Sequence, residues 1–168
     1  MRRLVLTLLV LALASASVWL IIRSREPAPT PTLPPTSTST APTRQIIGTS
    51  VEGRSIEAYT YGTGSTPLLF VGGIHGGYEW NSVLLAYQAM DYLTANPSAV
   101  PKNLKVTIIP NANPDGVYKV IGKEGRFALT DAPIAGTAGA GRFNAHQVDL
   151  NRNFDCKWQP ESMWRSQP

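Results

Sequence analysis

Cysteine and histidine are nearly absent from this chain of 168 residues, which holds one Cys and two His. A single thiol, Cys156, cannot close a disulfide within the chain, and it cannot build a thiolate metal cluster. Any metal bound here therefore has to be held by imidazole and carboxylate groups. The length predicts one folded domain.

An excess of charge of one sign is missing from the body of the chain. The net charge of +4 comes from residues 1–44, whereas residues 45–168 hold ten basic and ten acidic side chains. A neutral body with scattered Lys and Arg has no net field that would steer it to a polyanion. We therefore predict no nucleic-acid partner.

One long apolar run is present at the N-terminus. Leu4 to Ile22 contains 19 residues without a charge, and as a helix it would be about 28 Å long, close to the hydrocarbon thickness of a bilayer. A cleaved signal peptide is the alternative, with Ala14–Ala16 as the small-residue cleavage site. Cleavage there would leave the apolar residues 18–22 exposed, so we predict that residues 1–25 stay as a signal anchor in a membrane.

Residues 26–44 have the composition of a linker. Pro27 to Thr43 holds six Pro and eight Ser or Thr among 17 residues, which cannot bury a core and stays extended. In polyproline II form it would reach ~50 Å. A body tethered so far from a membrane suits work outside the cell, so we predict an extracytoplasmic location, secreted if the signal is cleaved. A mere spacer is equally compatible with this composition.

The body, residues 45–168, shows the patterns of an α/β domain. Residues 55–62 alternate apolar and polar side chains, whereas residues 67–71 form a continuous apolar run, typical of a strand covered on both faces. Helical spacing begins at Trp80 and continues to about Leu93, and residues 104–109 predict another strand. We expect a mixed, largely parallel sheet with packed helices.

A second region, residues 121–147, has little periodicity and predicts a long loop. Such a loop in a compact domain is usually functional or belongs to something larger.

His75 and Glu79 stand four residues apart, just beyond an apolar strand and at the start of the next helix. In α/β sheets the crevice beyond the carboxyl ends of the strands is where ligands bind. Imidazole and carboxylate are groups that Zn²⁺ accepts at a catalytic centre. A helix-start Glu that is favoured by the macrodipole, beside an unrelated His, is the simpler interpretation of this pair alone.

Two further segments carry polar side chains that suit recognition. Residues 111–116 follow a strand and by themselves predict a turn, because Asn, Pro, Asp and Gly each favour one. Residues 141–153 contain Arg142, Arg152 and several Asn. Arg binds a carboxylate through two parallel charge-assisted hydrogen bonds. A surface loop with solvated charges remains the alternative for this second segment.

In their order and separation these motifs resemble the M14 zinc carboxypeptidase family. The likeness covers about residues 45–165. The residues that carry it are Glu52–Ile56, His75 with Glu79, Asn113–Gly116, Arg142 and Asp149–Asn153.

The resemblance implies a zinc-dependent hydrolase that removes C-terminal residues from peptides with a free C-terminus. It makes His75 and Glu79 two of three Zn²⁺ ligands. It makes Arg142 the arginine that polarises the scissile carbonyl, and it makes Asn151 and Arg152 the pair that grips the terminal carboxylate. Asp149 resembles a residue that orients the first His, as a metal-bound imidazole generally needs.

The chain departs from the family pattern at two points. The ligand pair is spaced His-x-x-x-Glu rather than His-x-x-Glu, and the family's third ligand, a His, and its general-base Glu have no match here. His146 is the only other histidine, and we expect it to be a loop residue. We therefore expect a partial peptidase domain that is inactive alone. A cell-wall endopeptidase or amidase, or a non-catalytic peptide-binding module, are the alternative functions.

Overall fold

The computed structural model describes residues 41–160. The predicted membrane segment, residues 4–22, lies outside this range. Among the described residues no helix combines the length and the apolar character needed to cross a bilayer. The strands are β1 (Thr43–Thr49), β2 (Ser55–Tyr61), β3 (Thr66–Val71) and β4 (Leu104–Ile109), the α-helices are α2 (Trp80–Ala95) and α3 (Pro114–Ile121), and the short 3-10 helices are η1 (Gly76–Glu79), η2 (Pro97–Ala99), η3 (Leu129–Asp131) and η4 (Leu150–Arg152).

The four strands form one mixed sheet in the order β1-β2-β4-β3. The pair β3–β4 is parallel, and the pairs β1–β2 and β2–β4 are antiparallel. The predicted mixed sheet is therefore confirmed, but among the described strands it is not largely parallel. The β1–β2 pair is a hairpin, whose strands run in opposite directions because a short turn joins them, and β2 also pairs antiparallel with β4.

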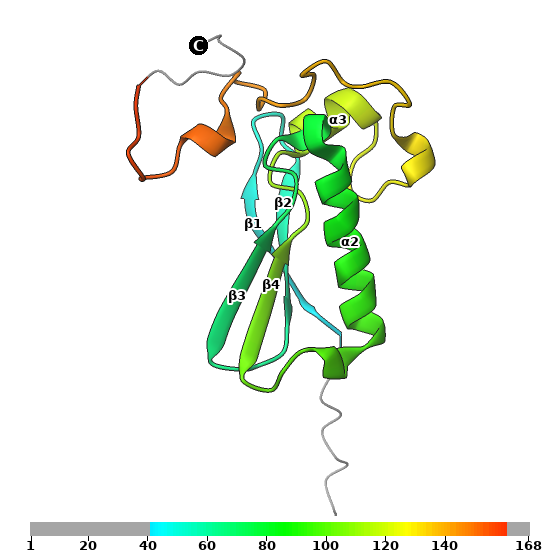
Figure 1. Cartoon of the computed structure of the whole chain (residues 1–168), viewed down its shortest axis with the longest axis vertical. Helices are drawn as coiled ribbons and strands as arrows, with labels where there is room; N and C mark the ends of the chain where they lie inside the picture. The colour runs from blue at the N-terminus through cyan, green and yellow to red at the C-terminus, as the bar shows by residue number, and fades with distance from the viewer. Residues whose placement is uncertain (1–40, 161–168) are drawn as a thin grey trace, which may run out of the picture. The chain divides into compact units, whose positions relative to one another are not determined.

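Helix α2 runs along the sheet beside β3 and β4 (Figure 1). Its buried positions Val83, Ala86, Tyr87 and Met90 recur every three to four residues, as one face of a helix requires. The helix predicted over residues 80–93 is thus confirmed. The core between helix and sheet also contains Tyr61, Val106, Ile108, Val117 and Phe127.

Strand β3 lies at an edge of the described sheet and pairs only with β4. All six of its residues are exposed, among them Leu69 at 59% and Phe70 at 52%. Our expectation of a strand covered on both faces is therefore wrong for these residues. The apolar run predicts the strand itself, but no described element packs over its outer edge.

One strand and one α-helix were not predicted. Strand β1 begins at Thr43, within the predicted linker, because its residues pair with β2 from Thr43 opposite Thr60 onward. Helix α3 occupies the segment that we interpreted as a turn and the start of a loop. Its signals were present: the Asn113 side chain caps the helix by accepting from the Gly116 amide, and Pro114 takes the first helical position.

Asp115 ties helix α3 to the turn between β1 and β2. Its carboxylate accepts hydrogen bonds from the Ser50 hydroxyl at 2.6 Å, the Glu52 amide at 3.1 Å and Arg54 Nη1 at 2.8 Å. Burial opposes ionisation of Asp115, but these hydrogen bonds outweigh it and hold the pKa of the carboxyl below its usual value. The buried Asp115 carboxylate is therefore charged, and both of its oxygens accept hydrogen bonds.

We expect Asp115 to make folding stability depend on acid pH. Because its pKa is lowered in the folded state, its contribution is present above the pKa of the unfolded chain and is lost as the pH falls through the folded value. Asp115→Asn should remove on the order of 3 kcal/mol at pH 7 and less at pH 3, as urea unfolding will measure. Asp91→Asn, which removes an exposed ion pair with Arg126, is the control. An equal loss at both pH values would contradict this role.

Three chain segments approach one another closely where they carry glycine. A Cβ on Gly141 would lie 2.3 Å from the carbonyl oxygen of Gly116, and one on Gly76 would lie 2.6 Å from that of Gly141. Gly77 is equally close, because a Cβ there would lie 2.4 Å from the Gly116 oxygen. We call these four residues the glycine junction. It joins η1, α3 and the loop before Arg142 without space for a side chain.

Substitution in the glycine junction should lower stability beyond the usual backbone penalty. Gly141 has φ of 73° and Gly125 has φ of 69°, but a Cβ on Gly125 would meet nothing within 4 Å. Gly125→Ala should therefore cost about 1 kcal/mol from the left-handed backbone alone. Gly141→Ala should cost about 2 kcal/mol more, because backbone atoms must move apart. Thermal unfolding of both variants measures the difference, and equal losses would show that the junction is loose.

Candidate active site

The predicted ligand pair lies where strand β3 ends. His75 caps η1, and Glu79 is the last residue of that 3-10 helix. Nδ1 of His75 is 3.1 Å from Oε1 of Glu79, so the single helical turn brings the two side chains together as their spacing predicts. His75 is 6% exposed, whereas the Glu79 side chain is half exposed. The pair therefore opens to solvent on the Glu79 side.

The other ring nitrogen of His75 faces Asp149. Nε2 is 3.4 Å from Oδ1 of Asp149, which comes from a loop far along the sequence. Arg142 lies behind this carboxylate and donates to its Oδ2 from Nε at 3.1 Å and from Nη2 at 2.7 Å. All three side chains are buried. The structure thus brings four of the six predicted residues into one cluster: His75, Glu79, Arg142 and Asp149.

Asp149 is charged within this cluster. Burial opposes its ionisation, but the hydrogen bonds from Arg142 and from the Asn151 amide outweigh it and hold the pKa of the carboxyl below its usual value. His75 adds to the same direction through its charge interaction. A buried carboxylate next to an imidazole is an arrangement that holds the ring in one orientation.

Tyr78 and Asn113 also belong to the site. Asn113 lies in the predicted recognition segment, residues 111–116, whereas sequence reasoning did not select Tyr78. The Tyr78 ring stands edge-on to His75 with 6.5 Å between centroids, and Cζ of Arg142 lies 5.7 Å from the same ring. Asn113 donates from Nδ2 to the carbonyl of Arg142 at 3.3 Å. The Asn-Pro pair was a signal for a helix cap, but nothing in the sequence marked Tyr78 as a contact of Arg142.

Asn151 and Arg152 lie on η4, directly after Asp149, and both are exposed. Arg152 donates from Nη1 to the carbonyl of Asn151 at 3.0 Å. Both residues line a cavity of about 300 Å³. The other residues of its wall are Phe154, Cys156, Lys157, Trp158 and Gln159. Arginine and lysine beside aromatic rings suit an anionic group that carries an apolar side chain.

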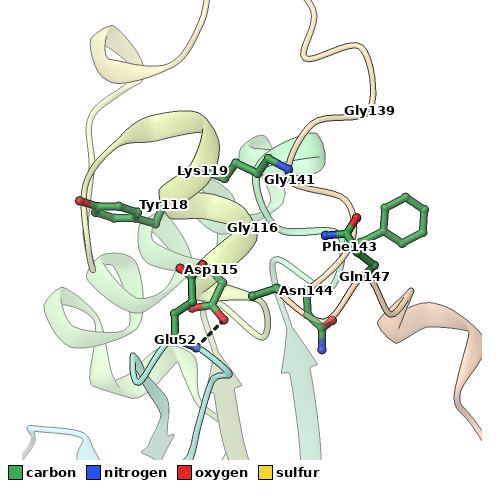
Figure 2. A pocket seen from close by; sticks show the side chains of 11 residues that line it. Glu52, Asp115, Gly116, Tyr118, Lys119, Gly139, Gly141, Phe143, Asn144 and Gln147 are labelled. Carbon is green, nitrogen blue, oxygen red and sulfur yellow. Dashed lines mark hydrogen bonds between the residues drawn. The ribbon is translucent and has the colours of Figure 1, made fainter.

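A second cavity, of about 410 Å³, lies between α3 and the loop that contains Gly141. Figure 2 shows Lys119 extending toward this loop and Glu52 lying against Asp115, with the bond from the Glu52 amide drawn. Phe143 points its ring away from the cavity (Figure 2). None of the six predicted site residues lines it, and Asp115 is already engaged by three donors, so we do not place the active site there.

The residues at His75 fit a metal ion in one respect. Both ring nitrogens are buried and neither makes a hydrogen bond to the part of the chain that the structure describes, despite the nearby carboxylates. A buried imidazole without a hydrogen-bond partner is costly unless another group binds it. Among residues 41–160, however, no group of three or more His, Cys, Asp or Glu side chains is arranged to hold a metal. The described residues thus bring the two predicted ligands together but supply no group of three.

Comparison with known proteins gives one family. The family model for zinc carboxypeptidases, Peptidase_M14, matches residues 36–168. Human carboxypeptidase Z is 33% identical over 123 residues, which cover 64% of this chain and 17% of that protein. Bacteriocin BCN5 of Clostridium perfringens is 31% identical over 118 residues, which cover 68% of this chain and 12% of that protein.

The fold comparison agrees with the sequence comparison. The crystal structure of carboxypeptidase A from Helicoverpa armigera superposes with a TM-score of 0.55 at 26% identity, over 74% of this chain and 31% of that one. The chain therefore spans less than a third of the length of each of these relatives. The match of the family model over most of its residues shows that the chain belongs to the M14 zinc carboxypeptidase family.

Proposed function

We propose that the cluster around His75 is part of the zinc site of a carboxypeptidase that removes residues from the free C-terminus of peptides. The observation that carries this proposal is the buried His75 ring, which has Glu79 at Nδ1 and Asp149 at Nε2. In this arrangement Glu79 is the proposed ligand carboxylate and Asp149 the orienting one. A metal-bound imidazole generally has such an orienting carboxylate at its other nitrogen. Family membership supports the same assignment.

His75 through Nδ1 and Glu79 through its carboxylate would hold the zinc ion. When bound, zinc supplies a Lewis acid that polarises a carbonyl and lowers the pKa of water. The residues of this chain hold the imidazole in place: Asp149 faces Nε2, and Arg142 binds the far side of that carboxylate. Burial of His75 limits the access of water to its ring.

Asn151 and Arg152 are proposed to bind the terminal carboxylate of the substrate. Both line the cavity after η4, where Lys157 adds a second positive charge and Trp158 an apolar wall. Because Asp149 caps η4, this cavity and the proposed zinc site are joined through one short segment. Binding the chain end there would set a bond one residue away at the metal, which makes the enzyme an exopeptidase.

The role of Arg142 toward the scissile carbonyl stays a prediction. Its guanidinium is bound to Asp149 and the residue is 4% exposed, so it would have to leave that carboxylate to reach a substrate. The membrane anchoring of residues 4–22 and the extracytoplasmic location also stay predictions. A catalytic zinc site also takes a third protein ligand, and among the described residues no group of three His, Cys, Asp or Glu side chains is arranged to hold a metal.

We expect the 168-residue chain to bind Zn²⁺ weakly and to show no peptidase activity, because a catalytic zinc normally takes three protein ligands. His75→Ala should weaken Zn²⁺ binding at least about tenfold. Loss of a residue that only orients a metal ligand typically lowers the metal affinity by about that factor, and loss of the ligand itself should lower it no less. His146→Ala, the matched control, should leave the affinity unchanged. Calorimetric titration with Zn²⁺ alone measures the affinity of the unaltered chain and of both variants.

Two outcomes of this experiment would contradict the proposal. Zinc binding that His75→Ala leaves unchanged would remove the proposed zinc site and favour a non-catalytic module. Tight binding that is lost in His146→Ala, together with release of C-terminal residues from peptides, would show that His146 completes the site.

We expect the cavity after η4 to distinguish peptides by their C-terminus. An acetylated dipeptide with a free carboxylate should bind better than its amide, and Arg152→Met should reduce this preference by about 1 kcal/mol, roughly fivefold. Arg126→Met, an exposed arginine elsewhere on the surface, is the control. Titrations followed by amide chemical shifts measure the affinities. Equal binding of acid and amide by the unaltered chain would refute the carboxylate site.

A further inference from the structure

The carboxylate of Asp149 has different partners at its two oxygens. Oδ2 accepts from Nε and Nη2 of Arg142 at 3.1 and 2.7 Å. Oδ1 accepts from the Asn151 amide at 3.0 Å and lies 3.4 Å from Nε2 of His75. The group cannot rotate about its Cβ–Cγ bond without losing these interactions. Its orientation toward His75 therefore depends on Arg142 together with the Asn151 amide.

We propose that Arg142 is a positioning residue that acts on His75 through Asp149. By holding Oδ2, it keeps Oδ1 turned toward Nε2 of His75, so that Asp149 fixes the imidazole ring with Nδ1 on the Glu79 side. The inference rests on the proposed function, in which Nδ1 is the nitrogen that binds zinc. In this role Arg142 orients His75 in the protein without substrate.

The burial and contacts of Arg142 support this positioning role. The residue is 4% exposed, and its carbonyl is held by Asn113 directly after the glycine junction. On the other side its guanidinium lies over Tyr78, whose ring also contacts His75. The hydrogen bond to its carbonyl and the Tyr78 ring together restrict the position of the Arg142 guanidinium, which binds Asp149 there.

The chemistry of arginine also fits the geometry. Two N–H groups of one planar guanidinium converge on a single oxygen, and this fixes the direction of the carboxylate as well as its charge. A lysine at this position would offer a point charge on a flexible stem, which attracts the carboxylate but leaves it freer to turn. A lysine variant thus separates orientation from charge.

The test uses the 168-residue chain without metal, with its histidines labelled with ¹⁵N. The chain has two histidines, and the exposed His146 serves as the internal reference. We expect the unaltered protein to show one sharp set of ring signals for His75. Arg142→Met should shift and broaden the His75 ring signals, whereas those of His146 stay in place.

Arg126→Met is the matched control, because Arg126 also pairs with an aspartate, Asp91, and lies over a tyrosine ring, with 4.6 Å between its Cζ and the ring centre of Tyr87. It should leave the His75 signals unchanged. A folded Arg142→Met protein whose His75 signals match those of this control would overturn the proposal.

Arg142→Lys decides the case if Arg142→Met does not fold. We expect a smaller shift of the same His75 signals, and none at all in a folded protein would overturn the proposal. Asp149→Asn should shift them too, and Arg142→Lys added to that variant should move them no further. An additional shift would show that Arg142 acts on His75 directly. Because no zinc is present, these results are independent of whether the chain binds zinc or belongs to a peptidase.

Discussion

The close approach of backbone at the glycine junction is the constraint on which the site depends. At Gly76–Gly77, Gly116 and Gly141, three segments meet so closely that carbonyl oxygens occupy the places where Cβ atoms would be. One segment is η1, which connects His75 to Glu79; another is the start of α3; the third leads into Arg142. A side chain at any of these glycines would push apart residues whose distances set the chemistry.

Charge at the site is arranged around one carboxylate. Asp149 is buried among Arg142, His75 and the first turn of η4, and a buried charge is stable only when its oxygens are hydrogen-bonded. The same residue begins the segment that carries Asn151 and Arg152. The proposed metal ligands and the proposed substrate cavity are thereby linked through a single side chain.

The location of this chemistry follows from the parallel pair in the sheet. β3 and β4 run side by side in the same direction, and His75 follows the end of one while Asn113 follows the end of the other. The carboxyl ends of parallel strands are where α/β folds bind ligands. The antiparallel strands β1 and β2 contribute support instead, through the contacts of Asp115 with the turn between them.

The sequence by itself determined what depends on near neighbours in the chain: strands β2, β3 and β4, helix α2, the proximity of His75 to Glu79, and, through the order of its motifs, the family. Only the tertiary structure decided that β3 lies at an edge, and that Asp149 reaches His75 with Arg142 bound to its other oxygen. Side-chain periodicity reports a local face of a strand or helix, whereas contacts between distant segments depend on how the chain packs.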